Sequence, residues 1–246
     1  MTVVRKAWAL ARWFVVLEIG IWRSLFLWVT RRVSGRGPGV ETFSYARQIS
    51  PLFGAFIFVS AIELPVVHLL LPWDSVRLVA DVLSVWALLW MVGMLAGVRV
   101  FPHLLDEAGL RVRYGTTVNI RVPWDAIASV KGRRGSVDTG KSVHVDHGAD
   151  AGATVMSVPV MKLTRVAIEL RGPTTIDLPD GPQQGVMELR CYVDDPSAFV
   201  ARANARLGGY RDAASGHDGS HARAPTPAAQ PRTGRADRGS GRVRPR

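Results

Sequence analysis

Cysteine is nearly absent from this chain of 246 residues, which contains only Cys191. A single cysteine excludes a disulfide within the chain, and it fits a reducing compartment. Acidic side chains are also few, since 20 Asp and Glu stand against 31 Lys and Arg, for a formal net charge of +11. This excess of positive charge favours contact with anionic lipid headgroups or, less specifically, with nucleic acid.

Charged residues are scarcest in residues 50–100, where two runs of about 20 mostly apolar residues flank the short link Trp73-Asp74-Ser75. At about 1.5 Å per residue, each run spans the roughly 30 Å of bilayer hydrocarbon. Because the link is short, the two helices must be antiparallel neighbours. The sequence therefore predicts a transmembrane hairpin over residues 50–100, and the internal position of the run argues against a secretory signal peptide.

Capping residues and prolines mark the expected ends of the two helices. Ser50 is expected to cap the first helix and Pro51 to occupy its first turn, while Pro72 ends it. Asp74 or Ser75 is expected to cap the second helix.

Basic residues predict the orientation of the hairpin. The flanks carry the arginines, whereas the link region has only Arg77; the flanking arginines are Arg31, Arg32, Arg36, Arg47, Arg99, Arg111 and Arg113. By the positive-inside bias, both flanks are cytoplasmic. We therefore expect a multi-pass protein of the cell membrane with both termini in the cytoplasm.

Few polar residues interrupt the apolar runs, and three of them, Glu63, His68 and Asp81, are candidate functional residues. Antiparallel pairing about the link brings His68 level with Asp81. Glu63 lies near mid-span, so we expect it to be protonated or bonded to Ser60, the Trp86 indole or an arginine of the N-terminal helix. Three interpretations stay open: polar contacts between helices, a proton or ion site, and a dimer contact.

The N-terminal segment, residues 4–32, is long and apolar but contains Arg12, Glu18 and Arg23. A charge near mid-bilayer costs at least about 2.5 kcal/mol. On a helical wheel Arg5, Arg12 and Arg23 share one narrow face, which predicts a helix lying in the membrane interface. A third span, with the N-terminus outside, is the alternative. Glycines and Pro38 indicate a linker up to residue 49.

Beyond Phe101 the apolar pattern alternates as in half-buried strands, in residues 110–114, 118–122, 127–130, 143–145, 166–170, 176–178 and 187–191. Turn signals fall between these segments, including Gly172-Pro173. Asp195 and Pro196 then begin an amphipathic helix that Gly208 and Gly209 should end. The sequence predicts an α+β fold over residues 101–208: about seven strands in an antiparallel barrel or sandwich with a C-terminal helix.

Five stretches carry a resemblance that spans about residues 20 to 208: residues 23–32, 61–68, 110–115, 122–127 and 194–196. They are similar to bacterial membrane proteins with a pleckstrin-homology-like (PH-like) domain after two spans, and more closely to an uncharacterised family of actinobacterial membrane proteins. The resemblance implies a PH-like fold and brings no catalytic residues. The basic cluster that binds lipid in eukaryotic PH domains is matched only by Arg113 and Arg121, so phosphoinositide binding is not implied.

Two further motifs favour ordinary loops. Residues 135–142 satisfy the phosphate-loop pattern GxxxxGK[ST], but that chemistry needs a following helix, and Ser142 to His147 alternates like a strand. A metal site of His144, Asp146, His147 and Asp150 is disfavoured because the two histidines point to opposite faces of a strand. We expect neither a metal nor a cofactor.

Basic residues supply the second set of candidates. Lys131, Arg133 and Arg134, with Lys141, are expected to form a basic loop that is either solvated or in contact with anionic lipid or an acidic partner. Arg12 and Arg23 of the N-terminal helix are expected among the phosphates. Cys191 is expected in the core, and residues 209–246 are expected to form a disordered basic tail.

These features predict a non-enzymatic scaffold or interaction protein, anchored in the membrane, that presents a cytoplasmic PH-like domain at the inner leaflet. Its expected partners are the bilayer, an unknown membrane or cytoplasmic protein and a second copy of the chain, without specific nucleic acid. The alternative is a small ion- or proton-coupled membrane protein that uses Glu63, His68 and Asp81. An NTPase would depend on Lys141, and we expect no nucleotide binding.

Overall fold

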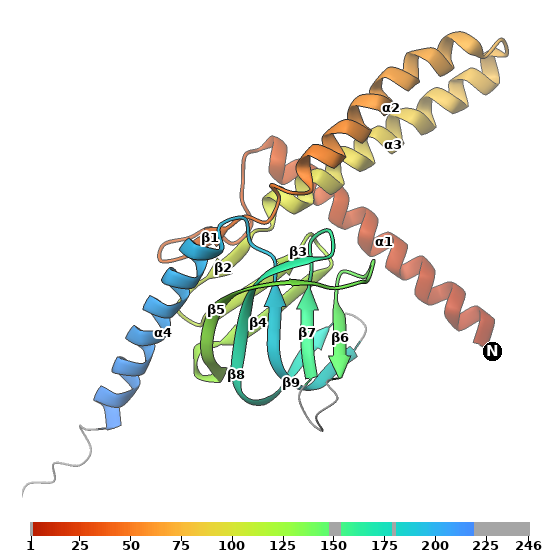
Figure 1. Ribbon diagram of the computed structural model, residues 1–246. Helices are drawn as coiled ribbons and strands as arrows, with labels where there is room; N and C mark the ends of the chain where they lie inside the picture. Colours follow the sequence, from red (N-terminus) through yellow and green to blue (C-terminus); the bar gives the residue numbers. More distant parts are fainter. Residues whose placement is uncertain (1, 148–153, 179–180, 219–246) are drawn as a thin grey trace, which may run out of the picture. The chain divides into compact units, whose positions relative to one another are not determined.

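The apolar segment folds into two helices, α2 (Ser50–Leu70) and α3 (Asp74–Val100), which pack against each other in the computed structural model (Figure 1). The structure describes residues 2–147, 154–178 and 181–218. Within these residues, α2 and α3 are the two helices long and apolar enough to cross a membrane. No residue of α2 is buried, and the buried residues of α3 begin only at Gly93.

The ends of these helices differ by one residue from the prediction. Ile49 and Trp73 occupy the N-cap positions, so the expected capping by Ser50 and by Asp74 or Ser75 is wrong. Asp74 instead lies in the first turn of α3 and forms an ion pair with Arg77. A carboxylate in the first helical turn also interacts favourably with the helix dipole.

The N-terminal helix, α1 (Thr2–Val29), packs against α3 through small residues. A Cβ atom added to Gly93 would lie 2.5 Å from Cγ2 of Ile21, and one added to Gly97 would lie 3.2 Å from Oγ of Ser24. Small residues four apart let two helix backbones approach closely. Towards its N-terminus, α1 diverges from α2 and α3 (Figure 1).

The remaining elements form two sheets and a helix. The first sheet has the antiparallel order β1-β2-β3-β4, and the second has the order β5-β8-β9-β7-β6, in which β7 and β9 are parallel. Their bounds are β1 Glu41–Phe43, β2 His103–Leu105, β3 Gly109–Tyr114, β4 Val118–Pro123, β5 Ile127–Ser136, β6 His144–His147, β7 Thr154–Val158, β8 Leu163–Leu178, β9 Gly181–Cys191 and helix α4 Pro196–Asp218. A short 3-10 helix, Trp124–Ala126, joins β4 to β5.

One hydrophobic core joins both sheets and α4. It contains buried side chains from both sheets, the 3-10 helix and α4, including Val112, Trp124, Ile168, Leu189 and Phe199. The α+β class is therefore confirmed. Along α4, Phe199, Ala203 and Leu207 are buried, while Val200 is half-buried. The predicted cap is present because the amide of Ala198 donates to Oδ1 of Asp195 at 3.0 Å.

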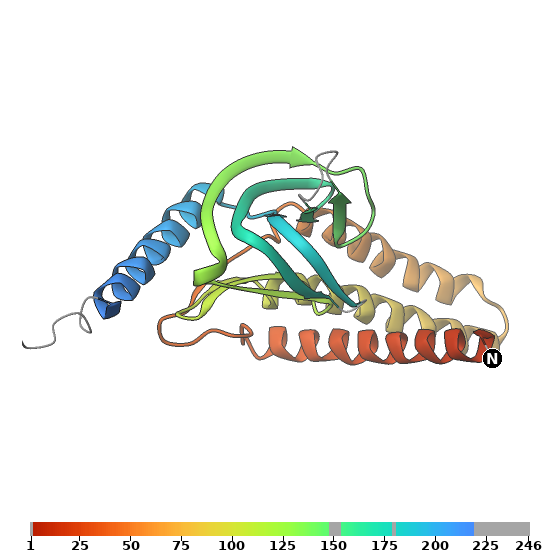
Figure 2. The same cartoon turned by 90° about the horizontal axis from the view of Figure 1, so that it is seen from below.

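Several predicted boundaries are wrong. The described residues contain nine strands rather than about seven, and β1 lies within the expected linker. Gly172-Pro173 makes no turn and lies within the continuous strand β8, which is bent (Figure 2). The pairing of β8 with β9 shifts register between Glu169 and Thr174, as at a β-bulge. Helix α4 continues through Gly208 and Gly209, since glycine weakens a helix by only about 1 kcal/mol. The predicted disordered tail is wrong for residues 209–218, which belong to α4. Residues 219–246 lie outside the described residues.

The apolar hairpin is inserted between two neighbouring strands of the first sheet. β1 precedes α2 and β2 follows α3, yet the two strands pair directly, with Glu41 opposite Leu105 and Phe43 opposite His103. The amide of Asp194 donates to the Ser44 carbonyl at 2.9 Å beside this ladder. The base of the hairpin is therefore part of the sheet rather than a flexible linker.

The contact between α1 and α3 predicts the effect of a small substitution. Gly93→Ala should destabilise the protein by about 1–3 kcal/mol, because the added methyl group overpacks the contact. In contrast, the structure places no heavy atom of its described residues within 4 Å of a Cβ added to Gly54 on α2. The melting temperature in detergent should therefore fall for Gly93→Ala but not for Gly54→Ala. Equal melting temperatures for the two variants would contradict the close packing.

Candidate functional site

The first predicted contact within the hairpin is confirmed. Nδ1 of His68 lies 2.7 Å from Oδ2 of Asp81. Glu63 does not join them: it is exposed on α2, and no described residue forms a hydrogen bond with its carboxylate. The expected bond from the Trp86 indole to Glu63 is wrong, because that indole donates to Glu18 instead. Hydrogen bonds between described residues therefore join two of the three candidates of the apolar hairpin, His68 and Asp81, and not Glu63.

Glu18 of α1 is the polar centre that sequence reasoning missed. Its Oε1 accepts from the indole nitrogens of Trp22 at 2.8 Å and Trp86 at 3.2 Å, and its Oε2 accepts from Trp90 at 2.9 Å. Two of these indoles come from α3, so the carboxylate joins α1 to α3. Only the spacing in the sequence hinted at this cluster. Trp22 is four residues after Glu18, and Trp90 is four residues after Trp86, so each pair lies on one face of its helix.

A buried polar cluster lies where α3 continues into the first sheet. Nδ1 of His103 accepts from the Arg113 amide at 3.0 Å, and its Nε2 lies 2.9 Å from the Tyr192 carbonyl, to which it donates. These partners define a neutral imidazole. Burial lowers the pKa of His103 to about 4. The Tyr45 hydroxyl accepts from the Gly115 amide at 2.7 Å, and burial raises its pKa.

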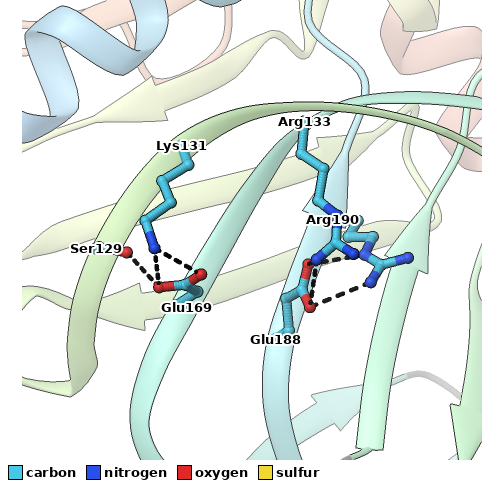
Figure 3. Close-up of polar contacts among 6 residues, drawn as sticks. All are labelled: Ser129, Lys131, Arg133, Glu169, Glu188 and Arg190. Atoms are coloured by element: carbon cyan, nitrogen blue, oxygen red, sulfur yellow. Dashed lines mark hydrogen bonds and ion pairs between the residues drawn. The ribbon is translucent and has the colours of Figure 1, made fainter. Parts of the chain in front are cut away.

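Lys131, Arg133 and Arg134 lie on strand β5, so the predicted basic loop is wrong for these three residues. Lys141 lies in the connection between β5 and β6. Figure 3 shows Lys131 and Ser129 donating to Glu169, with Lys131 Nζ at 2.8 and 2.9 Å from its two oxygens. Arg133 contacts the Glu188 carboxylate at 3.3 Å. Arg190 approaches the same carboxylate to 2.8 Å. Lys131 and Arg133 are therefore paired with carboxylates on β8 and β9.

The pKa shifts of these side chains have the directions expected for paired charges. The hydrogen bond from Lys131 lowers the pKa of the Glu169 carboxyl, and the bond to Glu188 raises the pKa of the Arg190 guanidinium. Arg134, the third residue of the predicted loop, is exposed on the same strand. A role for Lys131, Arg133 and Arg134 in binding lipid or a partner stays a prediction.

The other basic candidates lie on α1. Arg12 is exposed. The Arg23 guanidinium lies 5.8 Å from the ring centroid of Phe101, and Arg23 lines a cavity of about 390 Å³ together with Arg113 of β3. Nη1 of Arg113 donates to the Ser34 carbonyl at 3.0 Å, and burial lowers the pKa of this guanidinium. Two arginines from distant segments therefore meet in one cavity.

Neither the phosphate-loop pattern at residues 135–142 nor the histidines and aspartates after it have the surroundings that their binding chemistry needs. The strand β6, rather than a helix, follows the phosphate-loop pattern. His144, Asp146 and His147 lie on that strand, and the described residues contain no group of three side chains that could hold a metal ion; Asp150 lies outside them. Cys191 is buried, and burial raises the pKa of its thiol to about 12, which leaves it unreactive near neutral pH.

No family model, curated protein or solved structure matches this chain. The resemblance to membrane proteins with a PH-like domain therefore stays a prediction.

The buried imidazole of His103 predicts a pH dependence. Because its pKa is lower in the folded chain than in the unfolded chain, stability is complete above about pH 6.5 and falls as the pH approaches 4. Between pH 7.5 and pH 5 this group alone should cost about 2 kcal/mol of unfolding free energy. Asp194 opposes the effect of burial on this pKa, and Arg113 adds to it. Unfolding of His103→Gln at both pH values should lack this loss; an equal loss in both proteins would contradict the assignment.

The Glu18 contacts predict a second difference, between two glutamates of apolar helices. Glu18→Leu leaves three indole N–H groups without their acceptor and should destabilise the protein by about 1–3 kcal/mol. Glu63→Leu removes no hydrogen bond between described residues, so the melting temperature in detergent should not fall. If both substitutions lower it equally, Glu18 does not join α1 to α3.

Proposed function

We propose that this chain is a membrane-anchored, non-enzymatic interaction protein that holds a PH-like β-domain at the inner leaflet of the cell membrane. The observation that carries the proposal is the exposure of the hairpin. No side chain of α2 is buried, and α3 is buried only over its last turns from Gly93. An apolar surface of this extent needs a cover, and lipid provides one for two helices of spanning length.

The connection between hairpin and sheet supports presentation of the β-domain at the membrane surface. Only residues 101 and 102 separate α3 from β2, and β2 pairs with β1 on the other side of the hairpin. A domain attached in this way stays close to the bilayer. Its two sheets, with the C-terminal helix α4 packed into their core through Phe199, Ala203 and Leu207, support a PH-like fold.

The distribution of charge supports the inner leaflet. Arg31, Arg32 and Arg99 are exposed near the ends of α1 and α3 that lead into the β-domain. At the opposite end of the hairpin, the Arg77 charge is matched by Asp74. The base of the hairpin is therefore the more positive end, which the positive-inside bias assigns to the cytoplasm.

The first helix, α1, lies in the membrane interface and adds to the anchor formed by α2 and α3. α1 lies outside the set of helices that are apolar enough to span, as far as the described residues show. Large apolar side chains are nevertheless exposed along it, including Trp8, Phe14 and Phe26. Together with exposed Arg12 and Arg23, they give α1 the composition of a helix that lies among headgroups.

Interaction is favoured over catalysis because the side chains with reactive potential have structural roles. The neutral His103 is buried between two backbone partners, and the Cys191 thiol is buried in the core. Among the described residues, His68 contacts Asp81, but neither forms a hydrogen bond with Glu63, so the proton-coupled alternative has less support.

Reporter fusions test this topology. A reporter inserted at residues 73–76 should report the outer side, and reporters at the N- and C-termini should report the cytoplasm. The protein should also require detergent for extraction and stay soluble only with it. Reporters at the bend and at the C-terminus that report the same compartment would contradict the proposal.

Crosslinking in native membranes tests the interaction role in the same cells. The proteins captured with the full chain should differ from those captured with a chain that lacks residues 101–208, because the β-domain carries the contact surface. An unchanged set would contradict a role for this domain in interaction while leaving the membrane topology intact.

A further inference from the structure

A cavity of about 390 Å³ lies between α1 and the hairpin formed by β3 and β4. Arg23 enters it from α1, Arg113 from β3 and Asn119 from β4, where Asn119 is paired in register with Arg113. The hydroxyl-bearing Thr116 and Ser34 also line it. The cavity therefore gathers two cations and several neutral hydrogen-bonding groups from three separate segments.

The positive charge in this cavity lacks a matching carboxylate. None of the described residues that line it is acidic. Arg113 is 7% exposed and donates to the neutral Ser34 carbonyl, while Arg23 contacts the Phe101 ring. The nearby carboxylate of Asp106 forms its ion pair with Arg111 at 3.5 Å. A partly buried arginine without a counterion favours binding of an anion, because guanidinium groups bind phosphate and carboxylate oxygens strongly.

The apolar side of the cavity indicates what kind of anion fits. Val16 and Ile19 of α1 line it and are 62% and 61% exposed. They continue the apolar surface of a helix whose other exposed side chains include Val15 and Phe14. A ligand that fills this space therefore has a charged end and an apolar end, which describes an amphiphile better than a free inorganic ion.

The position along the hairpin matches the phosphate layer of a bilayer. Arg23 lies against Phe101, the residue directly after the end of α3. If α3 spans the bilayer, as the proposed function requires, its last turn lies at the boundary between hydrocarbon and headgroups. The cavity then opens at the depth where phospholipid phosphates lie, and this step of the argument rests on that proposed function.

We propose that the cavity lined by Arg23 and Arg113 binds the phosphate group of an anionic phospholipid. The two guanidinium groups contact the phosphate oxygens, Asn119 and Thr116 donate further hydrogen bonds, and Val16 and Ile19 contact the start of the acyl chains. The single negative charge of the bound lipid offsets one of the two positive charges of the cavity, and the lipid joins α1 to the β3–β4 hairpin.

The test uses the full-length protein in lipid nanodiscs of phosphatidylcholine, with and without one anionic lipid, phosphatidylglycerol. The anionic lipid should raise the melting temperature of the wild-type protein, and titration should yield a dissociation constant. Arg23→Gln removes a charged contact without altering a buried residue and should weaken this constant roughly tenfold. Asn119→Asp, at an exposed position of β4, adds a carboxylate to the cavity and should weaken it at least as much.

The control is Arg202→Gln, which removes one exposed charge from α4 and lies outside the cavity. It should leave the dissociation constant within about twofold, because surface charges away from the cavity are screened by salt. If Arg202→Gln weakens binding as much as Arg23→Gln, the attraction is diffuse and the proposed site is wrong. The proposal is also wrong if Asn119→Asp binds the anionic lipid as well as the wild type.

A second arm separates the lipid from a soluble anion. Inorganic phosphate at millimolar concentration, added to phosphatidylcholine nanodiscs, should not raise the melting temperature as phosphatidylglycerol does. If phosphate does raise it and phosphatidylglycerol adds nothing, the cavity is a site for a soluble anion and the proposal is overturned. Retention in nanodiscs is measured separately. Loss of retention would contradict the membrane hairpin itself, whereas retained protein without a preference for anionic lipid contradicts only the lipid site.

Discussion

The pairing of β1 with β2 is the constraint on which the rest of the unit depends. These strands are separated in sequence by both apolar helices, yet Glu41 lies opposite Leu105 and Phe43 opposite His103. Closing so long a loop costs conformational entropy. Burial beside the ladder offsets that cost, since the Tyr45 ring packs against the His103 ring and both side chains are buried. Both ends of the helical pair therefore connect to neighbouring strands of one sheet.

Several polar groups beside apolar surfaces contact partners from other segments. The Glu18 carboxylate accepts from three indoles, and two backbone groups contact the His103 ring. Oδ2 of Asp81 contacts His68, while its buried Oδ1 has no hydrogen-bond partner among the described residues. An unsatisfied polar group in these places would cost several kcal/mol. The cavity at Arg23 and Arg113 departs from this pattern, because its cations contact a neutral carbonyl and an aromatic ring. This contrast makes the cavity, rather than the paired charges of the second sheet, the place where an external anion fits.

Local patterns predicted some elements well and failed where the structure departs from a local rule. The runs that became α2 and α3 were long, and the alternation in β3 and β4 was regular. The three-residue strands β1 and β2 are too short to show a period. Gly172-Pro173 signals a turn in most contexts, but a bulge within β8 absorbs it. Lys131 and Arg133 looked like loop residues because the carboxylates opposite them, on β8 and β9, are far away in sequence.

The sequence by itself determined the two apolar helices, the alternating strands near them and the contact of His68 with Asp81, since a short link between antiparallel helices leaves little freedom of register. Only the tertiary structure decided the partners of Glu18, the burial of His103 and the placement of Arg23 and Arg113 along one cavity. The physical reason is the range of the interactions. Hydropathy and periodicity act within one element, whereas these contacts join elements whose separation in space depends on how every intervening segment packs.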